Sequence, residues 1–288
     1  MLHKRNFIRL FAFAIILLSY SSCIINDNIK DTSAVIDPGN DPNFKIIVNT
    51  DAGFENFNRK VVVFNIPIYA FTTVEDAKLL HLANILAQYL DNDEDGIVDN
   101  LIVHNDLKAN SGFLFVYSTD LEKDSFIAPN GTNGVHISNA DINLIWHSNG
   151  HTGAFDNSIE TVWSFIAKYG YEFTYPAVFG NQSNSELTLA MDDARGGNFQ
   201  NPPTSYPANA WYTNSDVACD YGCQLTSYNY WVMSSILGAQ ENRLTDIESE
   251  WKLNTSAKVQ SDDVKAWAIF SNANYNLPSV LPDGTYLH

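Results

Sequence analysis

The chain has 288 residues, of which 45% are hydrophobic and 17% are charged, a composition typical of a globular protein rather than a disordered one. The formal net charge of −17 argues against a nucleic-acid-binding protein, because such proteins rely on Lys and Arg contacts to phosphates. The length suits one large domain or two small ones, and no internal repeat divides it.

Residues 1–22 have the pattern of a signal peptide. Basic residues precede an unbroken apolar run over 11–18, which is too short to span a membrane. The sequence SSC ending at Cys23 resembles the end of a bacterial lipoprotein signal, although Tyr20 stands where that pattern prefers Leu. In such proteins the cysteine carries the lipid and becomes the new N-terminus. We therefore expect lipidation at Cys23 and a place in the bacterial cell envelope; the alternative is an ordinary secretory signal with an incidental cysteine.

The segment that follows is polar and includes Pro38 and Gly39. This composition predicts a flexible tether over 23–43. The remainder, 44–288, is then expected to form a single globular domain, near the upper size limit for one hydrophobic core.

Segments rich in β-branched and aromatic residues predict strands in the first part of this domain. They cover 44–50, 60–71, 112–118, 134–138 and 142–148. Between them, apolar residues recur with helical spacing over 72–90, where Thr72 or Thr73 can cap the helix. Helices are predicted later in the chain at 156–170, 184–197, 225–238, 245–254 and 261–275. Strands first and helices afterwards indicate an α+β fold.

The sequence LDNDEDGIVDN, at 90–100, has the ligand spacing of an EF-hand loop. Counted from the first aspartate, oxygen ligands are expected at positions 1, 3, 5, 7 and 9, with a glycine for the sharp turn at position 6. The ligands are carboxylates except at position 7, which offers a backbone carbonyl. These positions are Asp91, Asp93, Asp95, Ile97 and Asp99. A short helix is expected to follow over 99–110.

The EF-hand pattern ends before the loop 91–102 is complete. Position 12, normally a bidentate glutamate, is Ile102, so the last ligand would come from Asp106 or from a residue distant in sequence. The core therefore resembles the calcium loops of dockerins and thrombospondin type 3 repeats as much as a full EF-hand. We expect Ca²⁺ as the cofactor, bound weakly because a ligand is missing. The alternative is a solvated acidic turn.

Three cysteines are present, and lipidation of Cys23 leaves Cys219 and Cys223. An even pair in an oxidising compartment favours a disulfide, for which Gly222 permits a tight turn. Free thiols are the alternative.

A metal-dependent hydrolase is the rival hypothesis. His147 and His151 stand four residues apart, as the histidines of a zinc-peptidase helix do, and Glu160 is a weak candidate for a third ligand or a catalytic residue. Ser148 replaces the expected glutamate, and Asn149 with Gly150 favours a turn instead of a helix. Two polar loop histidines are the simpler interpretation.

Several stretches of the second half together resemble a family of secreted proteins and lipoproteins with one EF-hand-like calcium loop. They are YGYEFTYPAVFG, MDDARGG, YPANAWYT, CDYGCQLTSYNYW and LPSVLPDGTY. The resemblance covers most of 80–286. It implies zincin-like relatives that carry Glu-Glu-x-x-His on the helix at 156–170. Here Glu160 is followed by Thr161 and, at the histidine position, by Ser164, so the metal-binding motif is degenerate.

Trp211, Tyr212 and Tyr206 lie in one loop and are candidates for stacking against sugar rings, which makes a glycan-binding surface module a further alternative. The main expectation is a lipid-anchored envelope protein with a structural calcium site and one disulfide. We expect a binding protein rather than an enzyme, with calcium and the membrane as its partners.

Overall fold

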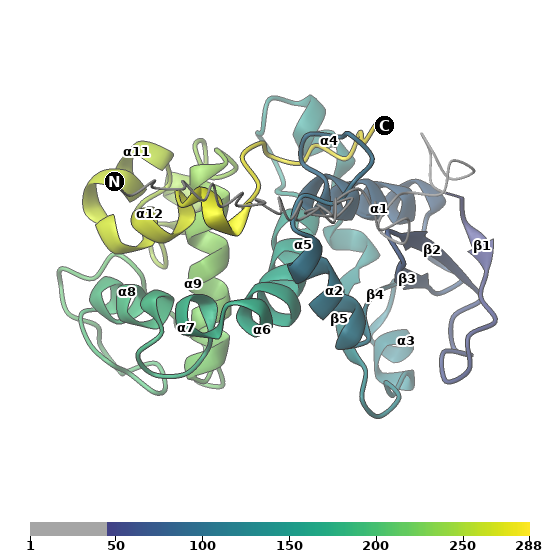
Figure 1. The fold of residues 1–288 in the computed structure, drawn as a ribbon, viewed down its shortest axis with the longest axis horizontal. Helices are drawn as coiled ribbons and strands as arrows, with labels where there is room; N and C mark the ends of the chain where they lie inside the picture. The colour runs from purple at the N-terminus through teal and green to yellow at the C-terminus, as the bar shows by residue number, and fades with distance from the viewer. Residues whose placement is uncertain (1–44) are drawn as a thin grey trace, which may run out of the picture. The chain divides into compact units, whose positions relative to one another are not determined.

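The computed structural model describes residues 45–288 (Figure 1). The predicted signal peptide 1–22, the lipidation site Cys23 and the tether to residue 43 lie outside these residues. Within 45–288, no helix combines the length and the apolar character needed to cross a membrane.

Five strands form one mixed sheet in the order β1-β2-β3-β4-β5. The strands are β1 (Ile47–Val48), β2 (Arg59–Val63), β3 (Ile66–Ala70), β4 (Gly112–Tyr117) and β5 (Asn133–Ser138). The first three pair antiparallel, whereas β4 and β5 add on in parallel. Parallel neighbours cannot be joined by a hairpin, so β3 and β4 require a long crossover connection. That connection carries the acidic loop.

Helices dominate the rest of the described chain, which confirms the predicted α+β fold. The helices before and after the acidic loop are α1 (Asp76–Leu90) and α2 (Leu101–Ala109). Those that follow are α3 (Asp120–Ser125), α4 (Leu144–Ser148), α5 (Ser158–Ile166), α6 (Glu172–Thr174), α7 (Pro176–Phe179), α8 (Glu186–Arg195), α9 (Tyr221–Ile236), α10 (Leu244–Ile247), α11 (Ser256–Asp262) and α12 (Val264–Phe270). A π-helical segment, η2 (Ala167–Tyr171), extends α5, and two short 3₁₀ turns are η1 (Asn139–Asp141) and η3 (Ala273–Tyr275).

Two predictions for the sheet region are wrong. The segment 60–71 is a hairpin rather than one strand, because Phe64 and Asn65 take the left-handed backbone conformation that a two-residue hairpin loop requires. The segment 142–148 forms α4 rather than a strand, since short apolar runs of this length do not separate helix from strand by period alone.

Most predicted helices lie where expected, but several of their ends differ. The helix predicted over 245–254 is wrong beyond Ile247, because α10 stops there and Trp251 pairs with Tyr212 in a β-bridge. The N-cap of α1 is Glu75 rather than a threonine. The helix predicted over 156–170 continues past Gly170 as η2. The helix predicted over 261–275 is divided between α11 and α12 at Asp263, whose side chain accepts a hydrogen bond from the Ala266 amide and caps α12. By contrast, Gly196 ends α8 in the left-handed conformation, as the sequence predicts.

One hydrophobic cluster joins the sheet region to the helical region. It contains α1 residues such as Leu82, α5 residues such as Trp163, and Trp251 from the segment after α10. Helix α5 packs against β5, α1 and α9, so it links the two regions of the fold. The Nε1 of Trp163 donates a hydrogen bond to Asn229 of α9 at 2.9 Å, which satisfies the one polar atom that this ring buries.

A disulfide joins Cys219 and Cys223, with their Cα atoms 5.2 Å apart, and confirms the predicted pairing. The turn between the two cysteines is not the glycine-dependent tight turn that the sequence predicts. Gly222 lies inside the first turn of α9, whose N-cap is Asp220. The helical turn therefore brings Cys223 back toward Cys219.

Candidate metal centre at the acidic loop

The acidic loop lies between two helices, as its spacing predicts. Asp91 directly follows the last residue of α1, and Asn100 caps α2 by accepting a hydrogen bond from the Val103 amide at 3.1 Å. Gly96 has a φ of +86°, a left-handed conformation that glycine adopts readily. A Cβ built on Gly96 would lie 2.1 Å from Nε2 of His288, so a side chain here would require the exposed His288 ring to move.

Asp91 is the buried anchor of the loop. Its side chain is fully buried, and its two oxygens accept hydrogen bonds from the Asp95 amide at 3.1 Å and the Gly96 amide at 2.8 Å. The Tyr286 hydroxyl, near the end of the chain, donates a further hydrogen bond to Oδ2 of Asp91. These donors hold the carboxylate in one orientation toward the centre of the loop.

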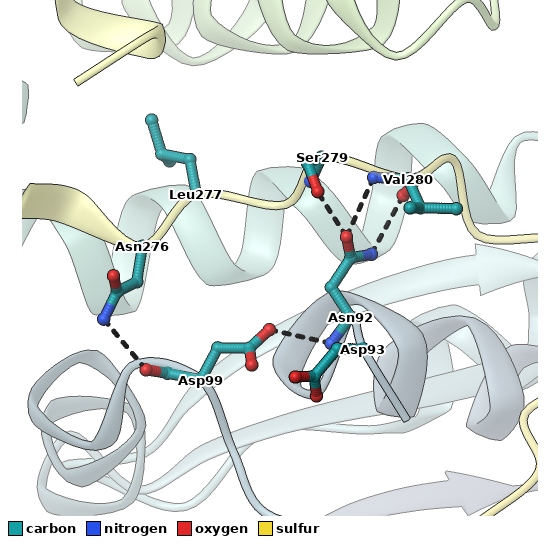
Figure 2. A pocket seen from close by; sticks show the side chains of 7 residues that line it. All are labelled: Asn92, Asp93, Asp99, Asn276, Leu277, Ser279 and Val280. Carbon is teal, nitrogen blue, oxygen red and sulfur yellow. Dashed lines mark hydrogen bonds between the residues drawn. The ribbon is translucent and has the colours of Figure 1, made fainter. Parts of the chain in front are cut away.

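Three carboxylates converge at this anchor. Asp91, Asp93 and Asp99 each offer an oxygen, and these oxygens lie within 4.8 Å of one another. Figure 2 shows Asp93 and Asp99 together, with Asp99 Oδ2 accepting a hydrogen bond from the Asn92 amide at 2.8 Å. Such a group of oxygen donors suits a hard divalent cation.

Two of the predicted ligands are not members of this group. Oδ1 of Asp95 accepts a hydrogen bond from the Ile97 amide at 2.9 Å, which stabilises the turn at position 7. Asp95 is exposed and Ile97 is half-buried. Both lie beside the converging carboxylates in the chain, and their role as ligands stays a prediction.

The missing twelfth ligand is not supplied from α2. Ile102 is 61% exposed, and its side chain has no ligand atom. Asp106 accepts a hydrogen bond from the Thr174 hydroxyl at 2.6 Å and does not belong to the group of three carboxylates.

The pKa values of Asp91 and Asp99 are both raised in the fold. Burial raises the pKa of Asp91 to about 6 despite hydrogen bonds from Tyr286 and the loop amides, and its hydrogen bond to Asp93 raises it as well. Burial and the charges of Asp93 and Asp95 also raise the pKa of Asp99. A cation among these carboxylates would offset both the burial and the mutual repulsion.

The C-terminal tail, residues 279–288, is bound to α1 through a column of amide side chains. Asn84 and Gln88 are four residues apart and therefore lie on one face of α1, and Asn92 follows shortly after the helix ends. The Asn84 side chain donates to the Gly284 carbonyl, and that of Asn92 accepts from the Ser279 and Val280 amides (Figure 2). Figure 1 shows the yellow tail running beside α1 toward the acidic loop.

An open pocket of about 470 Å³ lies between the acidic loop and residues 276–280. Its lining residues are Asn92, Asp93, Asp99, Asn276, Leu277, Ser279 and Val280. Asn276 donates to the Asp99 carbonyl at 3.0 Å, and Glu94 accepts from the Leu287 amide at 3.0 Å. The sequence does not predict these contacts between the loop and the tail, because the loop has a recognisable motif and the tail has none.

A second group of metal-ligand side chains consists of His81, His147 and Asp156. Nε2 of each histidine lies 2.7 Å from the same oxygen, Oδ2 of Asp156. His81 and Asp156 are buried, and the side chain of His147 is 6% exposed. The interactions with both histidines hold the pKa of Asp156 well below its usual range, against the effect of burial.

His151, the other histidine of the predicted pair, lies outside this group. Helix α4 ends at Ser148, and both Gly150 and His151 have positive φ, so the chain turns back and the four-residue spacing is not helical. The His151 ring stacks on Trp146, with ring centroids 4.3 Å apart.

Glu160 is half-buried on α5 and belongs to neither group of metal ligands. Burial raises its pKa to about 7, the charge of Glu250 raises it further, and Arg243 opposes both. Such a pKa suits a general base, but no histidine joins Glu160 in either group.

The aromatic candidates for sugar stacking have unequal access to solvent. Tyr212 is fully buried, and its hydroxyl donates to the Gln224 carbonyl at 2.8 Å. Trp211 is half-buried and donates from Nε1 to Asp263 at 2.9 Å. Tyr206 is half-buried and lines a separate cavity of about 510 Å³.

The described residues thus define an α+β protein with two groups of potential metal ligands, one of carboxylates and one mixed. The chain was compared with protein-family models, curated proteins and solved structures, and none of the three comparisons found a match.

Proposed function

We propose that the protein binds one Ca²⁺ in the acidic loop and that this ion has a structural rather than a catalytic role. The observation that carries the proposal is the convergence of Asp93 and Asp99 on the buried carboxylate of Asp91. The three side chains come from one loop whose spacing matches the first nine positions of an EF-hand.

The donor set favours calcium over other common cations. Every side-chain ligand is a carboxylate, and calcium accepts six to eight oxygens in a flexible arrangement. Magnesium demands a stricter octahedron and gives up water reluctantly. Asp95 and the carbonyl of Ile97 would add two ligands, and water would complete the shell because Ile102 has no oxygen in its side chain. We expect a Kd on the order of 10⁻⁴ to 10⁻³ M, the range of extracellular calcium modules.

The structural role follows from what surrounds the loop. Asp91 and Glu94 accept hydrogen bonds from tail residues Tyr286 and Leu287. An ion held by Asp91 would therefore fix the end of α1, the start of α2 and the C-terminal tail in one arrangement.

We further propose that the protein acts at the bacterial cell envelope, anchored by a lipid on Cys23. The lipoprotein-like sequence that ends at Cys23 supports this location, and the disulfide between Cys219 and Cys223 fits an oxidising compartment. Membership of a family of secreted proteins with one calcium loop and zincin-like relatives is part of the same proposal.

The experiment compares thermal unfolding of the protein in about 5 mM CaCl₂ with unfolding in chelator. For the expected Kd, ligand linkage predicts about 1 to 2 kcal/mol of stabilisation, or a Tm higher by about 2 to 8 °C. The double substitution Asp93→Ala with Asp95→Ala should remove this difference.

A matched control removes the same charge elsewhere. Asp120 and Asp124 are exposed acids of α3, with side chains 82% and 71% exposed. Asp120→Ala with Asp124→Ala should keep the calcium-dependent shift in Tm. The proposal is wrong if the wild-type protein melts at the same temperature with calcium and with chelator, as a solvated acidic turn would.

A further inference from the structure

We propose that His81, His147 and Asp156 form a second metal site, which takes a transition-metal ion such as Zn²⁺ and is separate from the calcium loop. The side chains come from α1, from α4 and from the segment just before α5. No sequence motif connects them.

The geometry brings three donor atoms to one point. Both Nε2 atoms lie 2.7 Å from Oδ2 of Asp156, and the two imidazole rings have centroids 5.1 Å apart. Around a tetrahedral zinc ion with bonds near 2.0 Å, neighbouring ligand atoms stand about 3.3 Å apart. Each histidine would therefore move away from Asp156 by about 0.6 Å to admit the ion.

The donor chemistry differs from that of the acidic loop. Imidazole nitrogen suits zinc and other first-row transition metals, whereas calcium selects oxygen. Two histidines and one carboxylate are three protein ligands, which leave a fourth position for water. A metal ion would also neutralise a fully buried carboxylate whose side-chain partners are the two histidines.

Two backbone amides hold the Asp156 carboxylate so that one oxygen faces the histidines. Oδ1 of Asp156 accepts hydrogen bonds from the Asn143 amide at 3.0 Å and the Ser158 amide at 3.2 Å, which leaves Oδ2 to face the histidines. Gly284 of the tail covers His81, because a Cβ built on this glycine would lie 2.1 Å from Nδ1 of the ring. Outer contacts of this kind fix the direction in which ligands point.

The outer contacts of His147 are incomplete. Nδ1 of this ring is buried and has no hydrogen-bond partner among residues 45–288. Metal binding at Nε2 would place the ring proton on Nδ1, where it stays unpaired. Loss of a hydrogen-bond partner to a metal ligand lowers metal affinity by about 10- to 100-fold. We therefore expect the affinity of this site for the metal to be lower by about the same factor than if His147 had such a partner.

The test is titration of the full, chelator-treated protein with CoCl₂, followed by displacement with ZnCl₂. We expect one equivalent of Co²⁺ per chain to produce visible absorption bands, and Zn²⁺ to abolish them. His147→Gln should lose the bands, while His151→Gln, which removes the neighbouring histidine outside the group, should keep them. Asp93→Ala with Asp95→Ala should also keep them, which separates this site from the calcium loop.

A second measurement does not depend on the folding of a variant. In the wild-type protein, ZnCl₂ should shift the imidazole NMR signals of His81 and His147 more than those of His151 and His136. The absence of cobalt bands in the wild-type protein would overturn the proposal, as would bands that survive His147→Gln. Either result would identify the trio as a hydrogen-bonded network with no metal.

Discussion

Glu160 shows how one side chain can make stability depend on pH. Its ordinary pKa of 4.5 rises to about 7 in the fold, because burial disfavours the charged form and Glu250 repels it. The folded state therefore binds the proton more tightly than the unfolded state does. Stability is highest below the ordinary pKa and falls as pH rises from about 4.5 to about 7.

Glu160→Gln should consequently stabilise the protein at pH 8, by on the order of 2 kcal/mol, because the amide has no charge to bury. The advantage should shrink as the pH falls and disappear near pH 4.5. Denaturant unfolding at several pH values measures this difference. The control is Glu248→Gln, a substitution at an exposed position. If Glu160→Gln raised the free energy of unfolding equally at all pH values, burial of the charge would not be the cause.

At the scale of elements, α1 organises both candidate sites. It places His81 in the mixed group, ends immediately before Asp91, and holds the tail through its amide side chains. Gln88 has the central place in this column. Its Oε1 accepts from the amides of Asp283 and Gly284, and its Nε2 donates to the side chains of Asp283 and Glu94.

Gln88→Leu should release the tail from α1 without removing apolar packing. Three hydrogen bonds to the tail are lost, each worth about 0.5 to 1.5 kcal/mol, so the free energy for opening the tail should fall by about 2 kcal/mol or more. Hydrogen exchange of the amides of residues 279–287 measures this opening. Gln182→Leu, at an exposed position, should leave the exchange rates unchanged; equal rates in wild type and Gln88→Leu would show that the column does not hold the tail.

At the scale of the whole described molecule, the sheet and the later helices share one hydrophobic cluster. Trp163 on α5 and Trp251 after α10 are each nearly or fully buried in it, as are β4 residues such as Leu114. Elements that share a core lose their packing together, because each one covers apolar surface of its neighbours.

Calorimetry of the protein should therefore show a single unfolding transition, with calorimetric and van't Hoff enthalpies that agree. Calcium should move this whole transition to higher temperature. Two transitions, only one of which responds to calcium, would show instead that the sheet region and the helical region are separate domains.

Local patterns in the sequence determined the features that depend on near neighbours. The spacing of Asp91, Asp93 and Asp99 placed three carboxylates together, because one turn of loop fixes where they lie. Gly196 marked the end of α8, and the pair Cys219 and Cys223 formed the disulfide. The α+β class followed from the same kind of information, namely the order of periodic segments.

Only the tertiary structure decided which distant residues meet. His81 and Asp156 are 75 positions apart, and Tyr286 lies 195 positions from Asp91. The sequence paired His147 with His151 because they are close in the chain, but the turn after α4 directs the two rings to different partners. The spacing of apolar residues along the sequence indicates which face of a helix or strand is apolar. This spacing does not indicate which other element covers that face, because the packing partner depends on how the complete chain folds.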